Sequence, residues 1–313
     1  MTNNPLVSVL MPAFNAEKFI SEAIGSIINQ DYPNWELLIL DDASMDSTLQ
    51  IIQTFQDKRI RFFQHQDNRG YLLSCNKLFE EAEGDFITFL DADDTCPPNR
   101  ISACLAEFES DSELGFLTTD HIRTDESGET ISENRMEVDY GRYASDPLYN
   151  PTICCATIFA RSKVARQTQG YRRLFRGLGG EDYFWLWELS KLGKGTHLNR
   201  NLYRYRRHAN QLSKGHIDEI YLYVPELAER LRERFSRKAF DESEAEEIKS
   251  ELRSEILVQP SLTDLRKAQI SVNNGNFANA FRLGIRALLK SNPKNVSEIL
   301  KLLFYVIPLR WLR

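Results

Sequence analysis

Residues 86–94 read FITFLDADD, an apolar run followed directly by an acidic cluster. The apolar part predicts a buried strand over residues 86–90. Carboxylates at the end of a buried strand repel one another unless a cation or hydrogen-bond donors compensate their charge. The spacing of Asp91 and Asp93 can direct two carboxylates at one hard divalent ion, which keeps water ligands and binds a substrate's phosphates. An acidic loop capping the helix near Asn99 is the alternative interpretation.

The segments around this stretch alternate short β-rich runs with helical periodicity. Further strands are expected over residues 6–11, 35–40 and 60–63, and helices over residues 19–28, 49–55 and 72–81. This alternation is typical of parallel strands joined by crossover helices, so the predicted class is α/β, with a Rossmann-like, mostly parallel central sheet. Ligands bind such sheets at the carboxyl ends of the strands.

The regular alternation stops after a helix at 101–108 and a strand at 116–119. A hairpin around Ser127 and Gly128, a strand over 152–160 and a helix from residue 181 are expected next. From about residue 216 the pattern is helical, so we place a catalytic domain at 1–215 and an α-helical C-terminal region at 216–313. Residues 265–290 within it predict a helical hairpin.

Composition excludes several classes of protein. The chain has 313 residues and a formal net charge of −6, which argues against a nucleic-acid partner. Five cysteines without Cys-x-x-Cys spacing indicate reduced thiols in a cytosolic protein, and the apolar run at 6–14 makes a poor signal peptide. We therefore expect a cytoplasmic location. Counted separately, residues 1–215 carry 23 basic and 31 acidic residues, so the acidic excess belongs to the α/β part.

A second acidic group lies in residues 40–48, LDDASMDST. Ser44 or Asp46 can cap the helix that follows. Capping does not explain two consecutive aspartates, Asp41 and Asp42, at the end of a strand.

Five segments taken together resemble a known family. They are residues 7–17 (VSVLMPAFNAE), 30–36 (QDYPNWE), 41–48, 68–70 (NRG) and 84–94, and a weaker match continues through 181–182 and 203–213. This ordered series, covering about residues 5–213, resembles the nucleotide-diphospho-sugar transferase (GT-A) fold of family 2 inverting glycosyltransferases.

The resemblance implies an enzyme that moves a sugar from a nucleotide-diphosphate donor, expected to be a UDP-sugar, to a hydroxyl of a glycan or lipid-linked acceptor. It implies Mn²⁺ or Mg²⁺ as cofactor and a role in cell-surface polysaccharide biosynthesis. It makes Asp182 or Glu181 the catalytic base, with Asp182 preferred, and it implies metal ligation by Asp91, Asp93 and His208.

The resemblance also implies a nucleotide pocket, in which Asp42 binds the base. The other implied nucleotide-binding residues are Pro12, Ala13, Phe14, Asn15, Glu17, Asn68, Arg69, Gly70, Asn76 and Ala92. Arg204 and Arg206 would assist at the diphosphate. Many relatives carry Arg-Asn where this chain has Cys75-Asn76, so an arginine contact is either missing or supplied by Arg69.

Other interpretations of the same residues stay open at this point. Asp91, Asp93 and Thr95 also fit the nucleophile motif of a haloacid-dehalogenase-type phosphatase, and a nucleotide-sugar binding module without catalysis is a third possibility. Glu181 and Asp182 could simply complement a helix N-terminus. Trp185 and Trp187 are either core residues or a platform for a sugar. No Gly-x-Gly-x-x-Gly follows the first strand, which disfavours a dinucleotide oxidoreductase.

The C-terminal residues 297–313 combine apolar side chains with Lys301, Arg310 and Arg313. This segment is too short to cross a bilayer, but it could lie on the inner face of an anionic membrane. Packing on the helices of its own chain, or in a homodimer, is the equal alternative.

Overall fold

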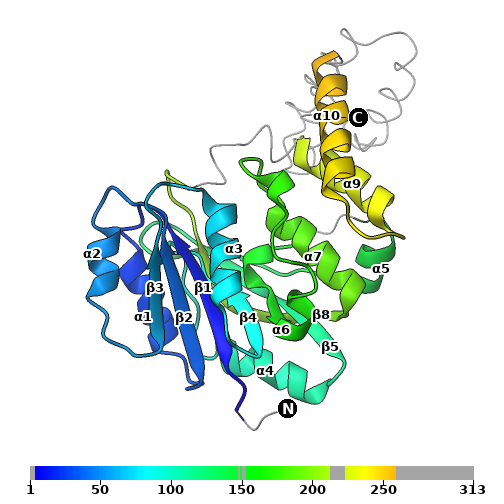
Figure 1. Cartoon of the computed structure of the whole chain (residues 1–313). Helices are drawn as coiled ribbons and strands as arrows, with labels where there is room; N and C mark the ends of the chain where they lie inside the picture. The colour runs from blue at the N-terminus through cyan, green and yellow to red at the C-terminus, as the bar shows by residue number, and fades with distance from the viewer. Residues whose placement is uncertain (1–3, 147–148, 150–152, 212–222, 259–313) are drawn as a thin grey trace, which may run out of the picture. The chain divides into compact units, whose positions relative to one another are not determined.

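The computed structural model describes residues 4–146, 149, 153–211 and 223–258 (Figure 1). The chain divides into two compact units, residues 1–214 and 215–313. Among the described residues, no helix has both the length and the apolar character needed to span a membrane. The hairpin expected at 265–290 and the apolar segment 297–313 lie outside the described residues.

The first unit is built on one mixed sheet with the strand order β3-β2-β1-β4-β7-β5-β6, and β8 pairs with β5 off this path. The strands are β1 Val7–Ala13, β2 Trp35–Asp41, β3 Ile60–Gln64, β4 Phe86–Phe89, β5 Leu114–Thr124, β6 Thr130–Asn134, β7 Phe159–Arg161 and β8 Lys194–Arg206. The first four pair in parallel, with Val9 of β1 between Leu37 of β2 and Thr88 of β4. Their carboxyl ends therefore share one edge of the sheet, called here the carboxyl edge.

Helices cover the sheet and connect its strands. They are α1 Ile20–Ile28, α2 Thr48–Gln53, α3 Tyr71–Glu81, α4 Arg100–Ser110, α5 Tyr140–Ser145, α6 Ser162–Ala165 and α7 Glu181–Leu192, with 3₁₀ turns at Cys155–Thr157 and Arg173–Phe175. In Figure 1, α3 lies over the parallel strands, where it packs on β1 and β2. The second unit contributes α9 Val224–Phe235 and α10 Glu242–Val258.

Burial explains why these segments become strands. Every residue of β1, β2 and β4 is buried, as expected for parallel strands covered by helices on both faces. In α1 the buried residues Ile20, Ala23, Ile24 and Ile27 recur at helical spacing and join the same core. The α/β class with a mostly parallel central sheet is confirmed, and the described part of the C-terminal region, residues 223–258, contains the helices α9 and α10.

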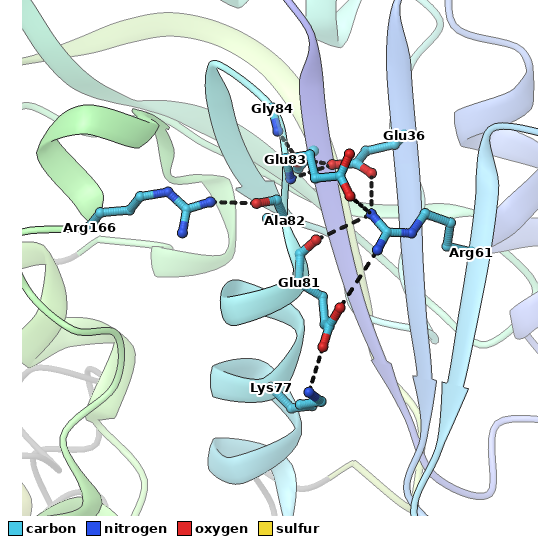
Figure 2. A network of polar contacts seen from close by, with 9 residues as sticks. Glu36, Arg61, Lys77, Glu81, Ala82, Glu83, Gly84 and Arg166 are labelled. Carbon is cyan, nitrogen blue, oxygen red and sulfur yellow. Dashed lines mark hydrogen bonds and ion pairs between the residues drawn. The ribbon is translucent and has the colours of Figure 1, made fainter.

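A charged network closes the opposite, amino edge of the sheet (Figure 2). Glu36 of β2 is 7% exposed and accepts hydrogen bonds from the Ser8 hydroxyl at 2.5 Å, the Glu83 N–H at 2.7 Å and the Arg61 guanidinium at 2.9 Å. Arg61 also pairs with Glu81 at the end of α3. One carboxylate thereby joins β1, β2 and β3 to the turn between α3 and β4.

One expected strand is shorter in the structure, and two elements were not expected. The strand expected over 152–160 forms only at Phe159–Arg161, because residues 155–157 make a 3₁₀ turn instead. The long strand β8 and the short helix α5 were not predicted. The sequence of β8, KGTHLNRNLYRYR, lacks strict alternation, and its pairing with β5 contains register shifts, so no period-2 signal is present.

Candidate active site

The loops after β1 and β2 are joined by backbone hydrogen bonds to side chains. The Asn15 N–H donates to the Ser44 hydroxyl at 2.9 Å, and the Met45 N–H donates to the Asn15 side-chain oxygen at 2.9 Å. Glu17 accepts from the Ser47 N–H at 3.0 Å, just before α2. Asn15 and Ala43 both have positive φ, 50° and 61°, which is unfavourable for residues with a Cβ. The two loops thus hold each other in one shape at the carboxyl edge.

Several predicted nucleotide residues lie in or beside these loops. Pro12 and Ala13 end β1 and are buried, whereas Phe14 is 45% exposed. An exposed aromatic ring between two rigid loops offers a face on which a planar base can stack. Asp46 accepts from the Thr48 N–H at 2.9 Å at the start of α2, as capping predicts.

The Asp42 side chain is hydrogen-bonded to the turn that precedes α3. Its carboxylate lies 2.7 Å from His65 Nδ1 and accepts from the N–H groups of Arg69, at 2.9 Å, and Gly70, at 2.7 Å. Gly70 has a φ of 89°, a conformation that suits glycine. Asp42 is 3% exposed, so in this structure its carboxylate shapes the segment carrying Asn68, Arg69 and Gly70.

The acidic turn after β4 divides into groups with different roles. Asp94 is buried, accepts from the Tyr203 hydroxyl at 2.7 Å and from the Arg206 N–H at 2.7 Å, and so fixes the end of β8. Asp91 accepts from the Tyr71 hydroxyl at 2.9 Å. Burial, followed by repulsion from Asp93, raises the pKa of Asp91 to about 7.

His208 and Arg206 reach this turn from the end of β8. The Nε2 atom of His208 lies 2.8 Å from Asp93 Oδ2, and the His208 ring packs on Phe19 with centroids 4.8 Å apart. Arg206 is 3% exposed and donates to the Asp93 carbonyl at 2.9 Å and to Glu22 at 2.6 Å. The Arg206 guanidinium therefore holds the fold together, while Arg204 is exposed and pairs through its backbone with Thr95.

The donor set at this turn suits a hard divalent cation only in part. Within the described residues, no three His, Cys, Asp or Glu side chains are arranged to hold a metal ion. Asp91 is partly exposed and accepts a hydrogen bond from Tyr71, while desolvation and then repulsion from Asp93 raise its pKa, and a cation would relieve that repulsion. Mg²⁺ and similar ions are commonly held by one or two carboxylates together with substrate phosphates, so Asp91 and Asp93 are a sufficient protein contribution.

Glu181 and Asp182 lie at the start of α7, after Gly180 in a left-handed conformation. Glu181 is 7% exposed, and its Oε2 atom has no hydrogen-bond partner among the described residues. Burial, followed by repulsion from Asp182, raises the pKa of Glu181 to about 8, and Asp91 adds to this effect. Burial also raises the pKa of Asp182. The carboxylates after β4 and at the start of α7 thus belong to one electrostatic cluster.

Asn76 bonds to the backbone of Tyr171. Its side-chain amide donates to the Tyr171 carbonyl at 2.8 Å and accepts from the Tyr171 N–H at 2.7 Å. It thereby attaches α3 to the segment that leads to α7. Ala92 is buried within the acidic turn.

The aromatic residues of α7 belong to the core. Trp185 is 1% exposed and donates to the Thr168 hydroxyl at 2.6 Å, and Trp187 is 2% exposed. Neither indole is available as a platform for a sugar. Tyr71, which holds Asp91, is not indicated by the sequence because a lone tyrosine in a helix carries no motif. Tyr203, which holds Asp94, begins the weaker match over 203–213, but that match gives it no role.

A family model described as glycosyl transferase family 2 matches residues 8–168, which include both loops and the acidic turn. The chain belongs to family 2 of the glycosyltransferases. It is therefore a transferase enzyme, and the alternative interpretation of the acidic turn as a phosphatase motif gains no support.

Three relatives show the range of this similarity. An uncharacterized glycosyltransferase of Haemophilus influenzae is 32% identical over 233 residues, 68% of this chain and 69% of the relative. Chondroitin synthase of Escherichia coli is 30% identical over 68% of this chain and 31% of its own length. The Escherichia coli enzyme WfgD, a UDP-Glc:alpha-D-GlcNAc-diphosphoundecaprenol beta-1,3-glucosyltransferase, is 42% identical over 31% of this chain and 38% of its own length.

Solved structures share the fold at low identity. Residues 1–349 of Staphylococcus aureus TarS in complex with UDP-GlcNAc superpose with a TM-score of 0.61 and 18% identity, covering 97% of this chain and 82% of that one. The mannosyltransferase PcManGT of Pyrobaculum calidifontis, in complex with GDP-Man and Mn²⁺, gives a TM-score of 0.57 at 15% identity, covering 96% of this chain and 80% of that one. The GT-A fold expected from the resemblance is confirmed.

Proposed function

We propose that this glycosyltransferase transfers a sugar from a nucleotide-diphosphate donor to a hydroxyl group of a glycan or lipid-linked acceptor, with inversion at the anomeric carbon. The observation that carries the proposal is an acidic cluster: Asp91, at the carboxyl end of β4, is held by the Tyr71 hydroxyl at 2.9 Å and lies near enough to Glu181 and Asp182, at the start of α7, for their charges to repel. A site for a donor phosphate and a site for a base thereby lie in one cluster.

The nucleotide would occupy the joined loops after β1 and β2. Phe14 offers an exposed ring for the base, and Asn15 and Glu17 fix the loop around it. The turn held by Asp42 supplies Asn68 and Arg69 at the same edge. UDP-GlcNAc bound to TarS and GDP-Man bound to PcManGT support a nucleotide sugar as donor. A uridine nucleotide is our preferred donor.

The reaction needs one protein base and no protein nucleophile. The acceptor oxygen attacks the anomeric carbon, the bond from that carbon to the diphosphate oxygen breaks, and its electron pair leaves with the diphosphate. Asp182 accepts the proton of the acceptor hydroxyl, and its raised pKa makes it a stronger base than an exposed aspartate. Burial and repulsion from Asp182 raise the pKa of Glu181, which favours a single proton shared by the pair, and we assign that proton to Glu181 because its Oε2 atom has no hydrogen-bond partner among the described residues.

A divalent cation is part of the proposal. Asp91 and Asp93 would hold Mn²⁺ or Mg²⁺, and His208 would orient Asp93 or complete the ligand set. When bound, the cation supplies Lewis-acid stabilisation of the negative charge on the leaving diphosphate. Mn²⁺ in the PcManGT complex supports this choice.

The acceptors named for the relatives indicate the biological setting. Chondroitin synthase and WfgD, which acts on a diphosphoundecaprenol-linked sugar, support a role in cell-surface polysaccharide biosynthesis. A cytoplasmic location, with the acceptor presented at the inner face of the membrane, completes the proposal.

A panel of UDP- and GDP-sugars with Mn²⁺ tests the function, with nucleotide release and thermal shift as readouts. The wild type should release nucleotide from at least one donor. Asp182→Asn should lower turnover by at least about a hundredfold while retaining donor binding, because only the base is lost. Asp93→Ala should lower turnover and also weaken donor binding.

Asp111→Asn is the matched control, since Asp111 pairs with Lys194 at the amino edge of the sheet. This variant should keep wild-type turnover. A wild type that neither binds nor cleaves any donor would overturn the proposed function.

A further inference from the structure

Charge is segregated in the segment that leads to the proposed base. Residues 147–180 contain six Arg or Lys residues and no Asp or Glu, although residues 1–215 as a whole are acidic. The first acidic residues after this segment are Glu181 and Asp182. Such a basic segment beside a cluster of carboxylates needs a structural or functional reason.

Three of the six cations have other roles. Arg161 donates to the Leu114 carbonyl at 2.7 Å, Arg166 donates to the Ala82 carbonyl, and Arg172 forms a buried pair with Glu188 at 2.6 Å. Lys163 has no such role, but it lies at the amino edge of the sheet, since the neighbouring Ser162 N–H donates to the Asp85 carbonyl there, and it is set aside for that reason. Arg173 and Arg176 remain, and both are exposed.

A third arginine joins these two from another part of the chain. The Arg176 guanidinium donates to the Arg69 carbonyl at 3.4 Å, which brings the turn before α3 beside the segment before α7. The Arg69 side chain is exposed, and its N–H is fixed by Asp42. None of these three guanidinium groups makes an ion pair within the described part of the chain. We call Arg69, Arg173 and Arg176 the arginine cluster.

The backbone beneath the cluster is held firmly. Leu174 and Phe175 are buried between Arg173 and Arg176, so the two arginines emerge from an anchored 3₁₀ turn. Tyr171 is bound to Asn76 on one side of this turn, and Arg172 is bound to Glu188. Cations on a fixed backbone lose little conformational freedom when they bind an anion.

We propose that the arginine cluster binds a phosphate group of the acceptor, an inference that rests on the proposed transferase function. Arginine binds phosphate oxygens through paired, charge-assisted hydrogen bonds, and three guanidinium groups without a carboxylate partner among the described residues suit a diphosphate or phosphodiester. The segment carrying Arg173 and Arg176 continues through Gly177, Gly179 and Gly180 into Asp182, which takes the proton of the acceptor. The donor diphosphate is assigned to a separate part of the site, at Asp91 and Asp93.

Two matched probes test the proposal by direct binding. One is GlcNAc joined through a diphosphate to a short phenoxyalkyl chain, and the other is GlcNAc joined to the same chain by an ether. Calorimetric titrations use the full-length protein, with and without saturating UDP and Mn²⁺. The wild type should bind the diphosphate probe in both conditions and should bind the ether probe at least about tenfold more weakly.

The double variant Arg173→Ala/Arg176→Ala should lose at least about tenfold in affinity for the diphosphate probe and keep the wild-type affinity for UDP. Arg173→Lys/Arg176→Lys should retain part of the binding because the charge remains. Lys163→Ala removes an exposed cation of the same segment at the amino edge of the sheet. It should leave the affinities for the diphosphate probe and for UDP at their wild-type values.

The outcomes separate the two possible sources of phosphate. An equal loss of UDP affinity in the double variant would assign the cluster to the donor and overturn the proposal. Unchanged affinity for the diphosphate probe would also overturn it. Failure of the wild type to bind UDP, with arginine-dependent binding of the probe intact, would instead contradict the proposed donor and leave the cluster established as a phosphate site.

Discussion

Glu181 and Asp182 are adjacent carboxyl groups in different surroundings. The Oδ1 atom of Asp182 accepts from the Tyr183 N–H at 2.7 Å, whereas Oε2 of Glu181 is buried with no partner among the described residues. A buried carboxyl group without a donor is more stable with its proton than as an anion. A single proton on the pair relieves the repulsion between the two carboxylates, and Glu181, which lacks a donor, is the more favourable place for it.

The raised pKa of Glu181 predicts an unusual dependence of stability on pH. Its pKa is about 8 in the folded chain against a model value of 4.5, so between these pH values the folded state binds more protons than the unfolded state. The free energy of unfolding should therefore fall as pH rises through this window. Glu181→Gln should remove that contribution. Its melting temperature should match the wild type near pH 5 and exceed it increasingly toward pH 8.

Differential scanning fluorimetry across pH 5 to 8.5 measures this difference. Glu113→Gln, at an exposed glutamate, serves as control and should follow the wild type at every pH. A Glu181→Gln curve parallel to that of the wild type would show that Glu181 is ionised in the folded state.

Among the elements, the amino edge of the sheet depends on one carboxylate. Glu36 joins β1, β2 and β3 to the turn before β4 through its bonds to Ser8, Arg61 and Glu83 (Figure 2). Gly84 completes this turn, since a Cβ there would lie 2.7 Å from the Ser8 N. Strand pairing and turn geometry are therefore coupled at this edge.

Removing the charge of Glu36 should weaken the whole first unit. Glu36→Gln keeps one oxygen, which can still accept from Ser8 and Glu83, but it removes the charge and places an amide NH₂ against the Arg61 guanidinium. This change should lower the free energy of unfolding by about 1 to 3 kcal/mol. Chemical denaturation measures the loss. Glu83→Gln is the matched control, because the Glu83 side chain is 71% exposed and pairs with the same arginine. That variant should change stability by less than about 1 kcal/mol.

The elements differ in how far their sequences predict them. The strands β1, β2 and β4 carry continuous apolar runs bounded by polar residues, so burial on both faces is readable from composition alone. The strand β8 is half polar, and it becomes a strand because β5 offers it a partner, which is a long-range cause. Local patterns predict the first kind of element and miss the second.

The same distinction applies to the site. Asp91 and Asp93 could be named because unexplained carboxylates stand at the end of a strand, whereas Asp182 was named through the family resemblance. The structural roles of Asn76 and Arg206 could not, because their partners lie 95 and 113 residues away along the chain. A motif records which residue types are present, and only the folded chain shows which of them are already bound to one another.

At the scale of the whole molecule, the proposed catalytic groups all lie in the first compact unit, residues 1–214. A chain of residues 1–214 should therefore fold and unfold as one cooperative domain and bind UDP with the affinity of the full chain. Circular dichroism melting and calorimetry with UDP and Mn²⁺ measure both properties. A broad, non-cooperative melt would show that the second unit is required for the first to fold.

The contact between Asp93 and His208 spans 115 residues of sequence. During synthesis the first four strands emerge together by residue 89, but His208 and the end of β8 emerge more than a hundred residues later. Contacts of such long range form late in folding because the intervening chain must first be ordered. A nascent chain can thus assemble its nucleotide loops early, yet it completes the cation end of the site only once nearly the whole first unit has left the ribosome.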